Sequence, residues 1–178
     1  YSRRYLERQL SPELERTRGL NHPVSLLLLD IDYFKRINDR YRHAVGDEVL
    51  RNTYRRLRDL LPRACDWIAR YGGEEFLIVL IDTDLRGAEI VAQRLVGGMA
   101  ETPIETSAGP IPVTISVGGS EAAQILTSDL NFTRLIEIAD QCLYASKRDG
   151  RNRYTMCLEG NSALAFSSTA SSAQRQAH

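Results

Sequence analysis

Hydrophobic and polar positions recur along this chain with the periods that are typical of strands and helices. The apolar run over residues 24–29, in VSLLLLDID, predicts a buried strand that ends in acidic residues. Two further runs, DWIARY and EFLIVLI, are joined across Gly72 and Gly73 and predict a β-hairpin, because glycine adopts positive φ at no steric cost. VTISVG and residues 153–157 predict two more strands.

Helical periodicity fills the segments between these strands. Leucines that recur every four residues predict an amphipathic helix over residues 5–18. A short helical turn is expected from Phe34, and Pro62 ends a longer helix that follows it. The remaining apolar stripes predict helices over residues 44–61, 84–99 and 132–148, the last of them capped by Asp129 or Asn131.

The order of these elements, β, α, α, β, β, α, β, α, β, predicts an α+β fold in which helices flank a central mixed five-stranded sheet. We expect a single domain over residues 1–157, because 178 residues suffice for one core of ordinary size. From residue 158 the composition shifts to Ser and Ala, with almost no large apolar residue after Phe166. This predicts a disordered tail over residues 158–178, with disorder from about residue 161.

The balance of charges narrows the classes of partner. Lys and Arg total 23, as do Asp and Glu, so the formal net charge is zero. A neutral chain has no global field that attracts nucleic acid, and we expect no nucleic-acid partner. The apolar runs are shorter than the roughly 20 residues that span a bilayer, and no signal-peptide pattern opens the chain, which favours a cytoplasmic domain. Since the sequence starts without Met, we expect a piece of a longer protein, whose membrane attachment stays open.

Three cysteines give no metal-binding pattern. Cys65, Cys142 and Cys157 are odd in number and lack the spacing of zinc ligands. We therefore expect three free thiols that behave as small hydrophobic residues in a reducing compartment.

Acidic residues at the strand ends suggest chemistry. Asp30 and Asp32 are two positions apart, so they point to the same face if the strand persists. Two carboxylates held close together repel each other unless a cation separates them. Glu74 lies at the apex of the hairpin, and a hairpin beside the first strand would bring it to the same edge. Oxygen-only ligands favour Mg²⁺ or Mn²⁺ over zinc.

Simpler interpretations of these acids stay open at this point. Asp30, Asp32, Glu74 and Glu75 are also compatible with ordinary solvated acids at strand ends, because short motifs often match by chance. Two strand-end acids are equally compatible with another nucleotidyl cyclase or a polymerase-like palm. The residues around them separate these alternatives.

Three stretches, taken together, resemble the GGDEF-domain family of diguanylate cyclases. They are DIDYFKRINDRYRHAVGDEVL, RYGGEEF and IADQCLYASKRDGRN, in the order and with about the spacing of that family, and the resemblance covers residues 2–156. It implies a fold similar to the palm of nucleotidyl cyclases. It also implies a homodimer in which each domain holds one GTP, and each 3′-hydroxyl attacks the α-phosphate of the opposite GTP. The products would be cyclic di-GMP and two pyrophosphates.

The resemblance assigns the acidic residues to a metal and phosphate site. Asp30, the backbone carbonyl of Ile31 and Glu74 would hold Mg²⁺ or Mn²⁺, and Glu74 would also accept a proton. Lys35 would stabilise the charge that develops on the phosphates. The substrate phosphates would further meet the backbone N–H groups of Tyr33 and Phe34, the side chains of Lys147 and Arg151, and the close backbone of Gly72 and Gly73.

The family pattern also assigns a guanine site. Asp47 would accept the N1 and amino protons of guanine, and Asn38 would hydrogen-bond the purine edge, which distinguishes GTP from ATP. His43 matches a position near the nucleotide, although a single histidine is often structural. The residue before it is usually Gly in the family and is Arg42 here. If this position needs positive φ, arginine costs on the order of 1 kcal/mol there.

A second ligand site is implied by RACD, residues 63–66. An RxxD at this spacing before the glycines matches the site where the family binds its product as an inhibitor. Arg63 would pair with phosphate and stack on guanine, and Asp66 would accept guanine protons. Arg94, on the helix after the hairpin, matches a supporting arginine.

Two functional hypotheses of different classes follow. The first is an active diguanylate cyclase with product inhibition, and the second is a catalytically idle receptor for GTP or cyclic di-GMP. An intact GGEEF together with Asp30, Lys35, Asn38 and Asp47 favours the first. The opening SRR resembles the end of the linker that precedes the domain in this family, which implies an upstream sensor or dimerising region outside this chain.

Overall fold

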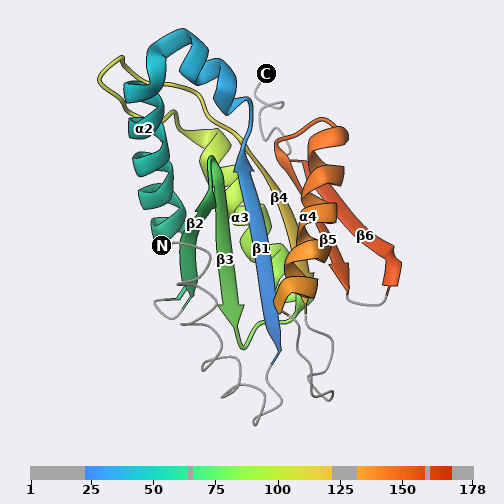
Figure 1. Cartoon of the computed structure of the whole chain (residues 1–178). Coiled ribbons are helices and arrows are strands. Elements are labelled where there is room, and N and C mark those ends of the chain that lie inside the picture. Colours follow the sequence, from blue (N-terminus) through green and yellow to red (C-terminus); the bar gives the residue numbers. More distant parts are fainter. Residues whose placement is uncertain (1–22, 64–65, 122–131, 159–160, 170–178) are drawn as a thin grey trace, which may run out of the picture.

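A mixed sheet of six strands carries helices on both faces in the computed structural model of the chain (Figure 1). The structure describes residues 23–63, 66–121, 132–158 and 161–169, the last range by its backbone. The strand order is β2-β3-β1-β4-β5-β6. The strands are β1 Val24–Ile31, β2 Trp67–Gly72, β3 Glu75–Ile81, β4 Ile115–Glu121, β5 Arg153–Leu158 and β6 Asn161–Thr169.

The first strand, β1, lies at the centre of the sheet because its side chains are apolar on both faces. It pairs antiparallel with β3 and with β4, while β4 pairs parallel with β5. Leu27 and Leu29 pack into one hydrophobic core, and Leu26 and Leu28 pack into a second core on the opposite face. An unbroken apolar run is what a strand covered on both faces requires.

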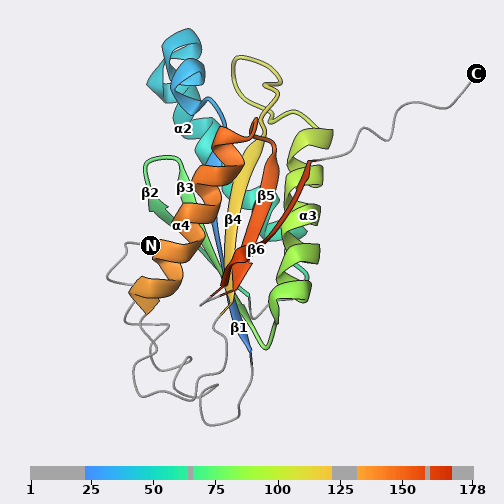
Figure 2. The same cartoon turned by 90° about the vertical axis from the view of Figure 1, so that its right-hand side faces the viewer.

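Three helices cover the two faces. They are α2 Phe34–Leu60, α3 Leu85–Glu101 and α4 Phe132–Arg148. Residues of α2 and α3 share the core of Leu27 and Leu29, and residues of α4 share the core of Leu26 and Leu28. Figure 2 shows the sheet between α4 and α3. The predicted α+β fold with a mixed sheet and flanking helices is therefore confirmed.

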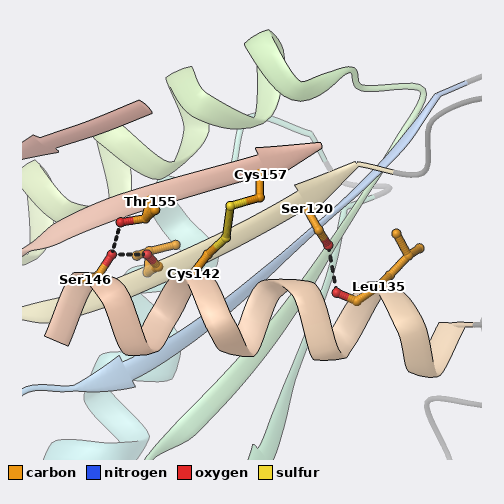
Figure 3. Close-up of a disulfide and its surroundings, with 7 residues drawn as sticks. Ser120, Leu135, Cys142, Ser146, Thr155 and Cys157 are labelled. Carbon is orange, nitrogen blue, oxygen red and sulfur yellow. Dashed lines mark hydrogen bonds between the residues drawn. A yellow bond between two sulfur atoms is a disulfide. The ribbon is translucent and has the colours of Figure 1, made fainter. Parts of the chain in front are cut away.

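The helix α4 lies unusually close to β4. A Cβ atom at Gly118 would collide with the carbonyl oxygen of Ala139 and the backbone nitrogen of Leu143, so glycine is required at this crossing. Near the end of the helix, Ser146 Oγ donates to the Val117 carbonyl at 2.8 Å and lies 2.8 Å from Thr155 Oγ1 (Figure 3). These contacts fix the last turn of α4 against β4 and β5.

The predicted helical turn at Phe34 and the predicted helix over 44–61 are joined into the single element α2. A kink divides them at Arg42, whose φ is 71° and ψ is 164°. This conformation is normally restricted to glycine, because a Cβ crowds the backbone there. The position therefore requires positive φ, and arginine occupies it at a cost.

Two strands, β6 and β4, differ from the sequence-based expectations. Residues 161–169, which were predicted to be disordered, form β6 and pair antiparallel with β5, so the sheet has six strands rather than five. Backbone pairing along an exposed strand edge supplies order that a composition of Ser and Ala does not indicate. The fourth strand also starts two residues later than VTISVG suggested and ends at Glu121.

The cysteines form a further correction. Cys142 on α4 and Cys157 on β5 are paired as a disulfide, with their Cα atoms 6.7 Å apart (Figure 3). The prediction of three free thiols is wrong for these two residues. Their spacing of 15 residues gave no signal in the sequence, because the contact depends on how α4 lies over β5.

Some predictions concern residues outside the described ranges. These are the helix over 5–18, the caps Asp129 and Asn131, the thiol of Cys65 and the predicted disorder of residues 170–178. Within the described ranges, no helix has both the length and the hydropathy needed to cross a membrane.

The strained kink gives a stability prediction. We expect Arg42→Gly to raise the unfolding free energy by about 1 kcal/mol, since relief of a conformation that costs about 1–3 kcal/mol outweighs the flexibility that glycine adds to the unfolded chain. Thermal melts should show an increase of about 2–4 °C for a chain of this size.

The neighbouring Arg40 provides a matched control for this experiment. It is exposed and has ordinary helical geometry, so Arg40→Gly should lower the unfolding free energy by about 1 kcal/mol. A loss of stability in Arg42→Gly equal to that in Arg40→Gly would contradict the strain at the kink.

Candidate functional site

The acidic turn of the hairpin lies against the end of β1. In the sheet register Asp30 is opposite Glu75, and the backbone N–H of Ile31 donates to the carbonyl of Glu74 at 3.4 Å. The glycine turn comes directly before these acids, and Gly73 has the positive φ of 48° that it requires. The structure therefore brings together Asp30, Ile31 and Glu74, as the sequence predicted.

A buried carboxylate paired with a lysine forms the centre of the site. Asp30 is 8% exposed, and its Oδ2 lies 2.8 Å from Nζ of Lys147, near the end of α4. Burial raises the pKa of Asp30 above its ordinary value, Lys147 opposes that rise, and the nearby charges of Glu74 and Asp32 add to it. The pKa of Glu75 is also raised, first by burial and then by the charge of Asp30. The combined negative charge of these carboxylates exceeds the single positive charge of the Lys147 ammonium group.

The oxygen atoms at this edge fit a divalent cation. Asp30 and Glu74 supply carboxylate oxygens, and Ile31, the residue after Asp30, supplies a backbone carbonyl oxygen. In the part of the chain that the structure describes, no three or more His, Cys, Asp or Glu side chains form a metal-binding group. A cation here would accordingly take two carboxylates and a backbone oxygen and complete its shell with water or substrate oxygens, which is usual for Mg²⁺.

A second aspartate, Asp32, has a structural role that the sequence did not reveal. It is 5% exposed and accepts hydrogen bonds from Thr114 Oγ1 at 2.7 Å, Ser116 Oγ at 2.6 Å and the backbone N–H of Asn152 at 3.0 Å. These bonds join the end of β1 to β4 and to the turn before β5. The available signal was the pair of hydroxyl residues two apart in VTISVG, at the period of one strand face.

The start of α2 is a second part of the site. Tyr33, at the N-cap, has a left-handed φ of 57°, and Lys35 is exposed in the first turn. The first backbone N–H groups of a helix lack intrahelical partners and favour an anion. The buried ring of Phe34 anchors this turn in the core beneath it.

The residues assigned to guanine lie on both sides of the kink in α2. Asn38 is half-buried and packs against Gly46, where a Cβ would collide with Asn38 Oδ1. Asp47 follows directly and is exposed, as is His43. The kink at Arg42 therefore brings Asn38 next to the Gly46-Asp47 pair and leaves the Asp47 carboxylate accessible.

A cavity of about 580 Å³ opens beside Asp47, between α2 and the hairpin. Three arginines line it, and no role was predicted for them from the sequence. One of them, Arg70, also donates from Nε to the carbonyl of Gly73 at 2.7 Å and so fixes the glycine turn. The described lining residues are Asp47, Leu50, Arg51, Tyr54, Arg55, Arg70 and Phe76.

Two cations of the KRDGR stretch, Lys147 and Arg151, lie at the same end of the sheet. Lys147 contacts Asp30, as described, and the guanidinium of Arg151 lies 4.6 Å from the ring centroid of Tyr33. The turn that carries Arg151 has positive φ at Gly150, Arg151 and Asn152. These cations therefore face the acidic turn and the start of α2 together.

The RxxD residues lie at the opposite end of β3. The guanidinium of Arg63 donates to the carbonyl oxygens of Ile81 at 3.1 Å and Asp82 at 3.4 Å, where β3 ends. Asp66 is 2% exposed and accepts from the backbone N–H of Arg63 at 3.2 Å through Oδ2. Its other oxygen, Oδ1, has no hydrogen-bond partner among the described residues. Arg94 is exposed on α3.

Comparisons with known proteins were made for the whole chain. The family model described as "Diguanylate cyclase, GGDEF domain" matches residues 1–153. The diguanylate cyclase DosC of Escherichia coli K12 is 35% identical over 153 residues, which cover 85% of this chain and 32% of DosC. The chain thus spans about a third of the length of that relative.

Solved structures give the same result for the fold. The active GGEEF domain of a diguanylate cyclase from Vibrio cholerae superposes with a TM-score of 0.77 at 32% identity, covering 90% of this chain and 98% of that domain. The GGDEF domain of DgcB from Caulobacter crescentus, in complex with c-di-GMP, has a TM-score of 0.76 at 25% identity, with 90% and 91% covered.

The raised pKa of Asp30 gives a prediction on stability and pH. A carboxyl whose pKa is higher in the folded protein costs folding free energy when ionised, and this cost disappears as the pH falls below its ordinary value of 3.8. We expect Asp30→Asn to melt at the same temperature as the parent or at a higher one at about pH 7. Any gain in melting temperature should shrink as the pH is lowered toward about 4.

Melts of both proteins across this pH range test the prediction. A variant that is clearly less stable at neutral pH would show that the pair with Lys147 outweighs the burial of the charge. Glu137→Gln on α4, where an exposed carboxylate pairs with nearby Arg134 at 3.1 Å, is the control and should show little pH-dependent change.

Proposed function

The chain belongs to the family of diguanylate cyclase GGDEF domains, and from this premise we propose that it condenses two molecules of GTP into cyclic di-GMP and two pyrophosphates. The observation that carries the proposal is the junction of β1 with the hairpin. The GGEEF turn lies beside Asp30 there, and Lys147 is 2.8 Å from the Asp30 carboxylate. A cluster of acids with adjoining cations at one edge is suited to a triphosphate and its metal.

Each acidic residue has a proposed role. Asp30, the Ile31 carbonyl and Glu74 would hold Mg²⁺ or Mn²⁺, which supplies charge neutralisation and a lower pKa for a coordinated hydroxyl. Glu74 is half-buried in the turn, and there it would also accept the proton of the attacking 3′-hydroxyl. Asp32 takes no part in this step, because its oxygens already accept three hydrogen bonds from the protein.

The substrate would be held at its phosphate end by cations and backbone N–H groups. Lys35 is exposed beside the end of β1, where it and the backbone N–H groups of Tyr33 and Phe34 would stabilise charge on the phosphates. Lys147 and Arg151 would bind the same oxygens from the other side. The open backbone of Gly72 and Gly73, where an added Cβ would meet nothing within 4 Å, allows the phosphates to approach the turn closely.

The base would be read by Asp47 and Asn38. The accessible Asp47 carboxylate can accept the N1 and amino protons of guanine, and adenine lacks that pair of donors. Asn38 lies beside it and can hydrogen-bond the purine edge. His43 is exposed nearby and would contact the ribose or base.

Catalysis by one domain would be incomplete. Each GTP supplies a nucleophile to the other, so two domains must face each other as a homodimer, and the chain spans only about a third of its relative DosC. We propose that a region outside this chain brings the two domains together and raises their effective concentration.

The RxxD residues would form a product site. Asp66 Oδ1 is a buried acceptor without a partner among the described residues, and burial raises the pKa of Asp66. A guanine N–H would satisfy that oxygen. DgcB, which this chain resembles in fold, was solved in complex with c-di-GMP. Arg63 would leave the carbonyls of Ile81 and Asp82 to pair with the ligand, and Arg94 would support it from α3.

Substitution of Glu74 tests the catalytic proposal. We expect Glu74→Gln to lower the initial rate of pyrophosphate release from GTP and Mg²⁺ by about 10²–10⁴-fold, because the amide neither binds the metal as a charged ligand nor accepts the proton. The parent's product should have the mass of cyclic di-GMP.

Two measurements serve as controls for this test. Glu137→Gln removes an exposed carboxylate from α4 and should leave the rate unchanged, while melts of both variants show whether the fold is retained. A parent that binds GTP without releasing pyrophosphate at any protein concentration would instead indicate the idle receptor.

Substitution of Arg63 tests the product site. Cyclic di-GMP should inhibit the parent at micromolar concentrations, and Arg63→Ala should relieve this inhibition while changing the uninhibited rate little, because the RxxD residues and the acidic turn lie at opposite ends of β3. Calorimetry with cyclic di-GMP measures the binding directly.

The control for this variant is Arg134→Ala, which removes an exposed arginine on the opposite face of the sheet. It should be inhibited as the parent is. Unchanged binding of cyclic di-GMP by Arg63→Ala would falsify the inhibitory site and leave the cyclase proposal standing.

A further inference from the structure

An exposed tyrosine stands at the N-cap of α2, where a small polar residue is usual. Tyr33 is 48% exposed, makes no side-chain capping bond and has the left-handed φ of 57° that disfavours a bulky side chain. An aromatic residue that breaks two local preferences at the edge of a site points to a role for its ring.

Two guanidinium groups lie over that ring. The Cζ of Arg36 is 4.5 Å from the ring centroid, and the Cζ of Arg151 is 4.6 Å from it. Both distances are well inside the roughly 6 Å of a cation–π contact. Arg36 is one turn away on the same helix, whereas Arg151 comes from the turn between α4 and β5, so the ring connects two distant parts of the chain.

The backbone of this second turn is fixed independently of the ring. The N–H of Arg151 donates to the carbonyl of Ser146 at 3.0 Å, and the N–H of Asn152 donates to Asp32 Oδ2 at 3.0 Å. These bonds locate the Cα of Arg151 but leave its long side chain several rotatable bonds. Among the described residues, the Tyr33 ring is the contact that restricts the guanidinium itself.

The arrangement gives little stability and is suited to binding an anion. Tyr33 is 48% exposed, where a cation–π contact contributes little to stability, and two like charges gathered at one ring repel each other until an anion arrives. Lys35 and the first N–H groups of α2 are immediately adjacent. Holding a side chain in its bound geometry before the ligand arrives removes an entropic cost from binding.

We propose that Tyr33 is a positioning residue whose ring, which Arg36 contacts from the same helix, holds the Arg151 guanidinium in the geometry that receives the GTP phosphates. This rests on the proposed function, and it concerns the side chain of Tyr33 and not its backbone N–H. The ring acts through Arg151 and before the chemical step. Its loss should therefore weaken nucleotide binding and leave the catalytic rate constant nearly intact.

The test uses Tyr33→Asn, because asparagine tolerates the left-handed backbone and lacks the ring. Calorimetry with a non-hydrolysable GTP analogue and Mg²⁺ should show a Kd raised about three- to tenfold, and KM for GTP should rise similarly while kcat stays within about twofold. Tyr33→Phe keeps the ring and should restore Kd to within about twofold of the parent.

A double-mutant cycle separates positioning from a general effect. In an Arg151→Ala background, Tyr33→Asn should raise Kd less than about twofold, since the group that the ring positions is already gone. Arg40→Ala removes an exposed arginine that stacks on Tyr41 of the same helix at 5.1 Å, and it should leave Kd unchanged.

The possible failures are distinguishable. If the parent itself binds no GTP analogue, the proposed function fails and this inference fails with it. If the parent binds and Tyr33→Asn binds equally well, or if the effects of Tyr33→Asn and Arg151→Ala are additive, the positioning role is overturned while the cyclase proposal stands. Equal losses in Tyr33→Phe and Tyr33→Asn would assign the effect to the hydroxyl and also overturn it.

Discussion

The buried carboxylate of Asp32 is the interaction on which this end of the molecule depends. It accepts hydrogen bonds from two hydroxyls near the start of β4 and from the backbone before β5, so three chain segments meet at one side chain. A buried charge without such partners costs several kcal/mol, which makes the three segments interdependent. Asp30 on β1 faces Lys147 at the end of α4 and the turn that carries Arg151 because Asp32 holds their supporting segments together.

Most of the fold could be predicted from the sequence, because local patterns indicate the strands and helices. The apolar run of β1, the glycine turn between β2 and β3 and the stripe of α4 needed only periodicity and turn chemistry. The pairing of Cys142 with Cys157 needed the docking of α4 over β5, and the order in β6 needed a free strand edge. Such information lies in tertiary contacts, which a local pattern does not contain.

The candidate site likewise contains contacts that the sequence predicted and contacts that it did not predict. Asp30 and Glu74 were predicted to meet because a hairpin next to the first strand leaves few alternatives, and the register of β1 with β3 places them together. Three features were not predicted: the hydrogen-bonded role of Asp32, the hydrogen bond of Arg70 to the glycine turn, and the two guanidinium groups over the Tyr33 ring. Each of these contacts joins residues whose chemistry is ordinary until the fold places them side by side.

The third strand has a mechanical consequence. One end of β3 carries the acidic turn and the other end is where Arg63 binds the carbonyls, about 20 Å away for a strand of seven residues. Its central residues are buried between two close-packed cores, which resist deformation. The strand is thus a stiff connection between the acidic turn and the carbonyl oxygens that Arg63 binds. A ligand bound at one end would therefore affect the other end by changing how whole domains are oriented. The strand would move as a rigid body and would not bend.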